Sequence, residues 1–350
     1  MAEKKIPAGI LGATGVVGQR FVQLLENHPW FEITWLAASD RSTDLEYGAA
    51  ARWRLKTPIP SRLESMRLAS AEPPGAPKLI FSALEAAVAD ELEPRFATAG
   101  HAVVSNASAF RMQPEVPLLV PEVNAAHVRL LEQQSWRAKG GFIVTNPNCS
   151  ATGLVMALAP LQQAFGVEKV FAVTMQAVSG AGYPGVASLD ILGNVIPYVA
   201  KEEEKMEIET RKMLGRLNGA GIAPAELTVS AHCNRVPVED GHTESVSVKL
   251  RKPATREQII QIFREFRGRP QELRLPSAPE RPIIFLEAAD RPQPVLDVNA
   301  GGGMSVSIGR LRACPLLDWK FTVLSHNTIR GAAGAALLNA ELLKAEGYLA

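Results

Sequence analysis

Cys149 is the residue of this sequence best placed for covalent chemistry. It stands in TNPNCSATG, between a segment that predicts a strand and a segment that predicts a helix. The dipole and free amides of a helix N-terminus stabilise a thiolate, and these amides, with Asn148, could bind the oxyanion formed when a thiolate attacks a carbonyl. The alternative is a buried, unreactive thiol, which is the interpretation we favour for Cys233 and Cys314 in apolar strands.

A possible base and two possible anion-binding groups lie elsewhere in the chain. His242 and Arg235 occur in RVPVEDGHTE, across a predicted strand, turn and strand. Histidine exchanges protons near neutral pH, and the arginine fork matches a carboxylate. Arg111 follows Asn106 just beyond a predicted strand end, where it could hold a phosphate. Lys205 lies in an acid-rich segment whose pattern is typical of a solvated helix face.

A glycine-rich turn near the start of the chain predicts a nucleotide site. The glycines of GATGVVG, between a predicted strand and helix, are Gly12, Gly15 and Gly18. A helix N-terminus in this position can bind a pyrophosphate, although a tight turn without a ligand is the alternative. The second predicted strand ends in Ser39, Asp40, Arg41 and Ser42. Arg41 between two hydroxyls suits the 2′-phosphate of NADP, whereas Asp40 would favour NAD; we favour NADP.

The elements that must position these residues fall into two groups. Strands and helices alternate up to Asn148, which predicts a Rossmann-type, doubly wound parallel sheet. Beyond it, long alternating strands and charged helices over 202–217 and 255–266 predict an inserted α+β domain with a mixed, largely antiparallel sheet. We expect residues 1–148 and 328–350 to form the first domain, because the small-residue C-terminal helix should return to it. Residues 149–327 would form the second domain.

Composition limits the classes of function. The 350 residues are 47% hydrophobic and 21% charged, with a net charge of +1. These values are typical of a globular protein and provide no general attraction to nucleic acid or membranes. We find no membrane span and no cleavable leader, so a cytoplasmic location is expected. The three cysteines lack the spacing of a disulfide framework or zinc site.

Six motifs together resemble one known family: GATGVVGQ, NASAFR, NPNCSATG, QAVSGAG, EEEKMEIETRK and RVPVEDGH. Over nearly its whole length the chain is similar to aspartate-semialdehyde dehydrogenases, particularly their archaeal and fungal branch. The resemblance implies an NADP-binding Rossmann domain and a catalytic and dimerisation domain. It also implies NADPH-dependent reduction of 4-aspartyl phosphate to L-aspartate 4-semialdehyde and phosphate through a cysteine thioester. That reaction serves lysine, threonine and methionine biosynthesis, in a homodimer or homotetramer.

The resemblance further implies roles for individual residues. Cys149 would be the nucleophile, His242 the acid and base, and Gln176 would position the acyl group. The substrate-binding residues would be Arg235 for the carboxylate, Glu202 for the amino group, and Asn106, Arg111 and Lys205 for the phosphate. The cofactor-binding residues would be Gly12, Thr14, Gly15, Val16, Val17, Ser39, Arg41, Ser42, Ser179, Gly180 and Asn327. Glu203 or Glu204 could replace Glu202, and no metal is implied.

Three alternatives share parts of this pattern. A malonyl- or succinyl-CoA reductase would use the same thioester chemistry with a CoA thiol as the leaving group. An N-acetylglutamyl-phosphate reductase is disfavoured, because its cysteine motif resembles NPGCYAT rather than NPNCSAT. A nucleotide-binding regulatory protein that has lost the chemistry is the non-enzyme alternative. The joint presence of Cys149, Gln176, Arg235 and His242 argues against it.

Overall fold

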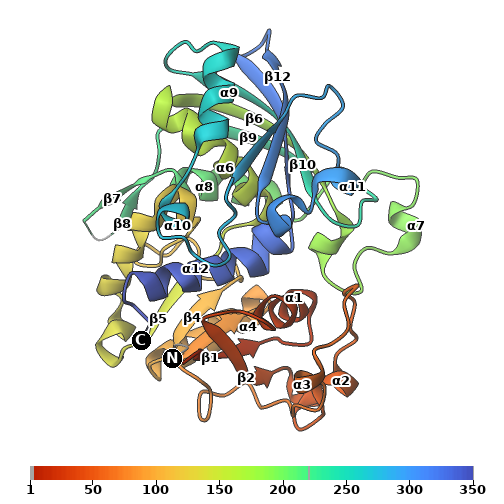
Figure 1. Cartoon of the computed structure of the whole chain (residues 1–350), viewed down its shortest axis with the longest axis vertical. Coiled ribbons are helices and arrows are strands. Elements are labelled where there is room, and N and C mark those ends of the chain that lie inside the picture. The colour runs from red at the N-terminus through yellow and green to blue at the C-terminus, as the bar shows by residue number, and fades with distance from the viewer. Residues whose placement is uncertain (1–3, 220, 350) are drawn as a thin grey trace.

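A computed structural model describes residues 4–219 and 221–349, and it contains a parallel sheet and a larger mixed sheet (Figure 1). The parallel sheet has five strands in the order β2-β1-β3-β4-β5. Its strands are β1 (Ile6–Leu11), β2 (Phe31–Ala37), β3 (Leu79–Ser82), β4 (Ala102–Ser105) and β5 (Phe142–Thr145). This order and direction confirm the predicted doubly wound sheet.

Helices on both faces explain why these strands are apolar. Every residue of β3, β4 and β5 is buried, as expected of a parallel sheet covered on both sides. The main helices of this part are α1 (Val16–Leu25), α4 (Ala86–Thr98) and α12 (Gly334–Ala345). Figure 1 shows α12 between the two sheets, where its apolar residues join the core formed by β1, β3 and α1. The short helices are α2 (Tyr47–Ala50), α3 (Ser61–Glu64) and α5 (Pro121–Asn124).

The second sheet has six strands in the order β11-β12-β13-β10-β6-β9. They are β6 (Val167–Gln176), β9 (Thr228–Arg235), β10 (His242–Leu250), β11 (Ile283–Leu286), β12 (Val306–Ala313) and β13 (Trp319–Ser325). The β6–β9 and β11–β12 pairs are parallel, and the other neighbours are antiparallel. Burial alternates along β9, because one face of the sheet packs against the buried helix α6 (Cys149–Ala164). The predicted mixed sheet is therefore confirmed.

Helix α8 (Glu202–Met213) is shorter than the predicted helix over 202–217. The chain instead turns into a hairpin of β7 (Arg216–Asn218) and β8 (Gly221–Ala223). Gly215 allows this turn, since a Cβ there would lie 2.5 Å from the carbonyl oxygen of Ala223. The remaining helices are α7 (Ser188–Ile191), α9 (Arg256–Glu265), α10 (Arg269–Glu272) and α11 (Pro294–Asp297). None of the helices in the described ranges is long and apolar enough to cross a membrane.

Candidate active site

Cys149 is the first residue of α6, directly after the turn that follows β5. Asn148 caps this helix, because its Oδ1 accepts hydrogen bonds from the backbone N–H groups of Ser150 and Ala151, each at 2.9 Å. The Nδ2 of Asn148 donates to Glu202 Oε1 at 2.7 Å. The side-chain amide of Asn148 is thus committed to positioning, which corrects its expected role as an oxyanion donor. Because this cap takes up the N–H groups of Ser150 and Ala151, the backbone N–H of Cys149 is the first-turn amide left for that role.

His242, the first residue of β10, lies beside the thiol. Its Nε2 is 3.2 Å from Cys149 Sγ, and its Nδ1 accepts the backbone N–H of Ala177 at 3.1 Å. The neutral ring therefore carries its proton on Nε2, facing the sulfur. Gly180 lets the adjoining loop pass over the ring, since a Cβ there would lie 3.0 Å from His242 Cε1 and 2.9 Å from Arg235 Nη1.

The electrostatics of the cleft favour a neutral pair of Cys149 and His242. Burial and the nearby Glu202 carboxylate raise the pKa of Cys149 to about 12, against the opposing effect of Arg111 and Arg235. Burial and the positive charge of Arg235 lower the pKa of His242 to about 3. The resting site thus holds a thiol beside a neutral imidazole. The expected helix-stabilised thiolate is wrong for this cleft, because burial outweighs the backbone N–H of Ser150 and the two arginines, which lower the pKa.

The sheet places Arg235 and Gln176 side by side. They end the paired parallel strands β9 and β6 and are partners in the register. Arg235 Nη1 donates to the carbonyl oxygen of Ala177 at 2.7 Å, and Gln176 Nε2 donates to Glu202 Oε1 at 3.3 Å. Both side chains are at least nine-tenths buried. A charged guanidinium and a primary amide are therefore available at one wall of the cleft.

The geometry distinguishes the three adjacent acids at the start of α8. Glu202 lines the cleft, and its Oε2 lies 3.8 Å from Lys205 Nζ. Glu203 instead accepts the backbone N–H of Cys233 at 2.9 Å, and Glu204 is exposed. Lys205 also lines the cleft, so the solvated face suggested by its acidic neighbours is wrong for this residue.

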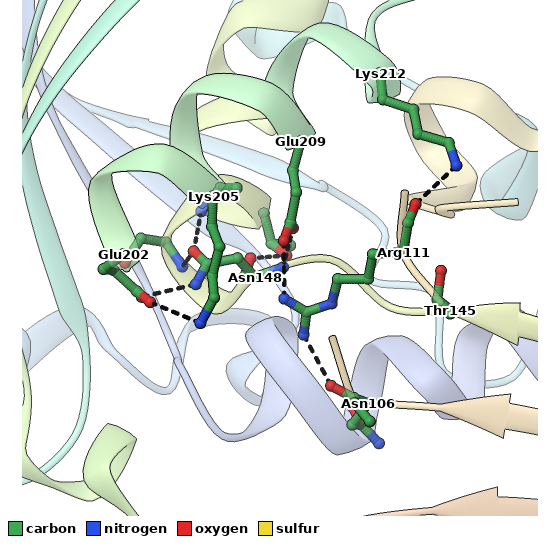
Figure 2. A network of polar contacts seen from close by, with 12 residues as sticks. Asn106, Arg111, Thr145, Asn148, Glu202, Lys205, Glu209 and Lys212 are labelled. Atoms are coloured by element: carbon green, nitrogen blue, oxygen red, sulfur yellow. Dashed lines mark hydrogen bonds and ion pairs between the residues drawn. The ribbon is translucent and has the colours of Figure 1, made fainter. Parts of the chain in front are cut away.

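Another wall of the cleft carries Arg111 and Asn106 (Figure 2). Arg111 donates through Nη1 to Glu209 Oε1 at 3.0 Å and through Nη2 to the carbonyl oxygen of Asn106 at 2.8 Å. Its Nε is buried without a partner among the described residues. Asn106 Nδ2 donates to the carbonyl oxygen of Ser82, and its Oδ1 accepts from Asn146. With Lys205, this wall presents positive charge to an anion.

The glycine-rich loop fits the predicted nucleotide site. Gly12 has a φ of +75°, and a Cβ there would lie 2.8 Å from the carbonyl oxygen of Ala83. A Cβ on Gly18 would lie 2.2 Å from the carbonyl oxygen of Gly12. Gly15 is less crowded and more exposed. The loop therefore needs glycine to stay tight, and it leaves the N-terminus of α1 open to a bound group.

One cleft of about 550 Å³ joins these walls, within the size range of ligand sites. The predicted residues that line it are Val16, Val17, Asn106, Arg111, Cys149, Gln176, Ser179, Gly180, Glu202, Lys205, Arg235 and Asn327. Asn327 Nδ2 donates to Ser179 Oγ at 2.8 Å, and Asn327 Oδ1 accepts the N–H of Gly241 at 2.9 Å. Gly12, Thr14 and Gly15 lie in the adjoining loop. Ser39, Arg41 and Ser42 lie outside the cleft, at the turn after β2.

Two residues of the site were missed in the sequence. Glu209 is 2% exposed and contacts both Arg111 and the backbone N–H of Asn148. Its helical spacing from Glu202 could have indicated a shared inward face. Gly331 lies against Cys149, since a Cβ there would be 2.7 Å from Cys149 Cβ, and no local pattern identifies it. Within 4–219 and 221–349, no cluster of His, Cys, Asp and Glu could hold a metal ion.

Two protein-family models match the chain. The model described as semialdehyde dehydrogenase, NAD binding domain, matches residues 7–131. The model described as semialdehyde dehydrogenase, dimerisation domain, matches residues 158–330. Together they reach every strand of both sheets except β5, which lies between the two matches.

Curated relatives match over nearly the full length or all of the chain. An aspartate-semialdehyde dehydrogenase of Methanothermobacter thermautotrophicus is 48% identical over 97% of this chain and 99% of its own. That of Candida albicans is 46% identical over 100% of both chains. A crystal structure of the Candida albicans enzyme with NADP superimposes with a TM-score of 0.91 at 44% identity, covering 97% of this chain and 99% of the other. These names do not favour the acyl-CoA reductase alternative.

Proposed function

This chain belongs to the aspartate-semialdehyde dehydrogenase family, and we propose that it reduces 4-aspartyl phosphate to L-aspartate 4-semialdehyde and phosphate with NADPH. The observation that carries the proposal is the 3.2 Å contact between Cys149 Sγ and His242 Nε2. This contact lies in a cleft with cationic side chains on two walls. A thiol beside an imidazole suits covalent acyl transfer, and the flanking cations suit a substrate that carries a carboxylate and a phosphate.

Substrate binding would activate the neutral pair. Arg235 would bind the substrate carboxylate, and Glu202 would meet the amino group. Pairing with the carboxylate offsets the positive charge of Arg235 that lowers the His242 pKa. As the sulfur attacks the acyl carbon, the Nε2–H of His242 would donate to Cys149 Sγ, and the proton of the thiol would leave with the departing phosphate. Gln176, beside Glu202, would hold the acyl group in position for attack by Cys149 Sγ.

The leaving phosphate would depart toward the wall that carries Arg111 and Asn106. Cleavage of the acyl C–O bond leaves phosphate, whose charge Arg111 and Lys205 would stabilise with Asn106 alongside. The buried, unpartnered Nε of Arg111 supports this role. The product of this step is a thioester on Cys149. When its C–S bond later breaks, His242 Nε2 would pass a proton to the sulfur while the ring takes up a proton from solvent.

The glycine loop would hold NADP(H), which supplies the hydride for the thioester carbon. The tight Gly12 turn and the open N-terminus of α1 fit a pyrophosphate. Val16, Val17 and Thr14 would line this part of the site. Ser179, Gly180 and Asn327 would orient the nicotinamide. In support, Gly180 packs against His242, and Asn327 bonds to Ser179 and to Gly241, the residue before His242. Ser39, Arg41 and Ser42 would bind the 2′-phosphate, because the turn that carries them follows β2, next to β1.

The organisation of the chain is part of the same proposal. Residues 1–148 and 328–350 would form the nucleotide-binding domain, and 149–327 the catalytic and dimerisation domain. The match to a dimerisation-domain model supports a homodimer. We place the enzyme in the cytoplasm, in the biosynthesis of lysine, threonine and methionine.

The test is the reverse reaction of the purified protein. NADP reduction by aspartate semialdehyde should require phosphate or arsenate, and Cys149→Ser should abolish it while NADPH binding persists. Turnover of malonyl-CoA with NADPH, and no phosphate-dependent reaction, would replace the substrate but keep the nucleophile. Near-normal rates in Cys149→Ser would overturn the mechanism.

A further inference from the structure

Helix α8 turns a polar face toward the site rather than toward solvent. Glu202, Lys205, Glu209 and Lys212 recur at intervals of three, four and three residues, which places them along one side of a helix. Figure 2 shows all four on the same side of α8, pointing toward Asn148 and Arg111. Three of them are less than one-tenth exposed. Buried charges are costly unless each has a defined partner, so this face has a specific task.

Glu209 is the member of this face that contacts two different segments of the site. Its Oε1 accepts from Arg111 Nη1 at 3.0 Å. Its Oε2 accepts from the backbone N–H of Asn148, the residue before Cys149, at 2.6 Å. If Glu209 only neutralised Arg111, the second short contact would be unnecessary. One rigid carboxylate therefore joins the guanidinium on the phosphate wall to the segment that carries the thiol.

Lys212, one helical turn farther along α8, holds the other end of Arg111. Its Nζ donates to the carbonyl oxygens of Arg111, Gln113 and Val116 at 2.7, 2.8 and 2.9 Å. The backbone of Arg111 is thus fixed by Lys212 and its guanidinium by Glu209. Because two residues of α8 fix both the backbone and the guanidinium of Arg111, this helix sets the direction in which the other guanidinium N–H groups point.

We propose that Glu209 is a positioning residue that holds Arg111 and Cys149 at a fixed separation, so that the sulfur meets the face of the acyl carbonyl while the phosphate of the same substrate lies against Arg111. The inference rests on the proposed function. It requires that Glu209 act through its two neighbours without touching the substrate. The negative charge of Glu209 also opposes anion binding by Arg111. Glu209 therefore fixes the position of Arg111 but weakens its binding of phosphate.

Two substitutions separate these effects. Glu209→Gln keeps the shape but offers one acceptor oxygen, so its amide N–H₂ must face a donor at one of the two contacts. Loss of one hydrogen bond to a charged group should lower kcat by about 10- to 100-fold, whereas loss of the charge should lower the KM for phosphate. Glu209→Asp keeps the charge but shortens the reach, so kcat should fall with no decrease in the phosphate KM. Glu207→Gln is the matched control, because Glu207 lies on the same helix and accepts the N–H of Ala231 at 3.3 Å.

The experiment measures phosphate-dependent NADP reduction by the full-length protein. Rates are divided by the fraction of protein that binds NADPH in a fluorescence titration, which corrects for misfolded protein. The inference is supported if kcat falls in both variants and the KM for phosphate falls in Glu209→Gln but not in Glu209→Asp. Equal kcat and KM in both variants and in Glu207→Gln overturns it, as does a loss fully explained by a smaller fraction of NADPH-binding protein. Absence of phosphate-dependent activity in the unsubstituted protein would instead overturn the proposed function.

Discussion

The buried pair of Glu122 and Arg330 offers a direct test of how the site is supported. Glu122 lies in α5, and Arg330 lies in the π-helical turn Ile329–Ala333 that precedes α12. Arg330 Nη1 and Nη2 donate to Glu122 Oε1 and Oε2 at 2.8 and 2.7 Å, and both side chains are 0% exposed. Gly331, the next residue, packs against Cys149. We therefore expect Glu122→Gln to destabilise both the fold and the wall behind the thiol.

The magnitude follows from the burial. Glutamine keeps the size of the side chain but leaves the guanidinium of Arg330 without a counter-charge, and removal of one partner of a buried pair costs about 3–5 kcal/mol. The other close contact of this guanidinium is the sulfur of Met156, a weak acceptor. At about 2 °C for each kcal/mol in a large chain, the Tm should fall by about 6–10 °C.

Thermal unfolding followed by circular dichroism, with the urea midpoint as a second measure, checks this value. The control is the double variant Glu122→Leu with Arg330→Met, because replacing both charges by apolar groups is often neutral. This double variant should unfold at a higher temperature than Glu122→Gln. A Tm change below about 2 °C in Glu122→Gln, or a double variant at least as unstable, would refute the argument from buried charge.

Three further predictions concern the site itself. Gly331→Ala should lower kcat strongly, because its Cβ would lie 2.7 Å from Cys149 Cβ. The free energy of unfolding should fall by about 1–3 kcal/mol or less. Steady-state kinetics measure the first effect, and a melting curve measures the second. The alkylation rate of Cys149 by iodoacetamide should still be rising between about pH 8 and pH 10, since burial and Glu202 raise its pKa to about 12, and Glu202→Gln should shift the profile to lower pH. A plateau reached below pH 8 would contradict this. Gly12→Ala should weaken NADPH binding measured by fluorescence titration, because a Cβ would lie 2.8 Å from the carbonyl oxygen of Ala83; unchanged affinity would show that the loop tolerates a side chain.

The fold was largely predictable because its signals are local. Helical and strand periodicity identified the parallel sheet and the mixed sheet, and the glycine turn before α1 marked the nucleotide end of the first. The end of α8 was missed, because the apolar and charged pattern continues past Met213 while Gly215 turns the chain into the hairpin. That turn depends on contacts with β8, which follows later in the chain.

For the site, motif type and order were enough to nominate Cys149, His242 and Arg235, since thiol, imidazole and guanidinium chemistry is intrinsic to the residues. Tertiary structure decided which of the adjacent acids faces the cleft, because that depends on the rotation of α8 against β9. It also decided the protonation of the Cys149 and His242 pair, because desolvation exists only after distant segments close over them. The link from Glu209 to Arg111 and Asn148 spans 98 and 61 residues of sequence. Such a contact arises from packing of whole elements, which no local pattern encodes.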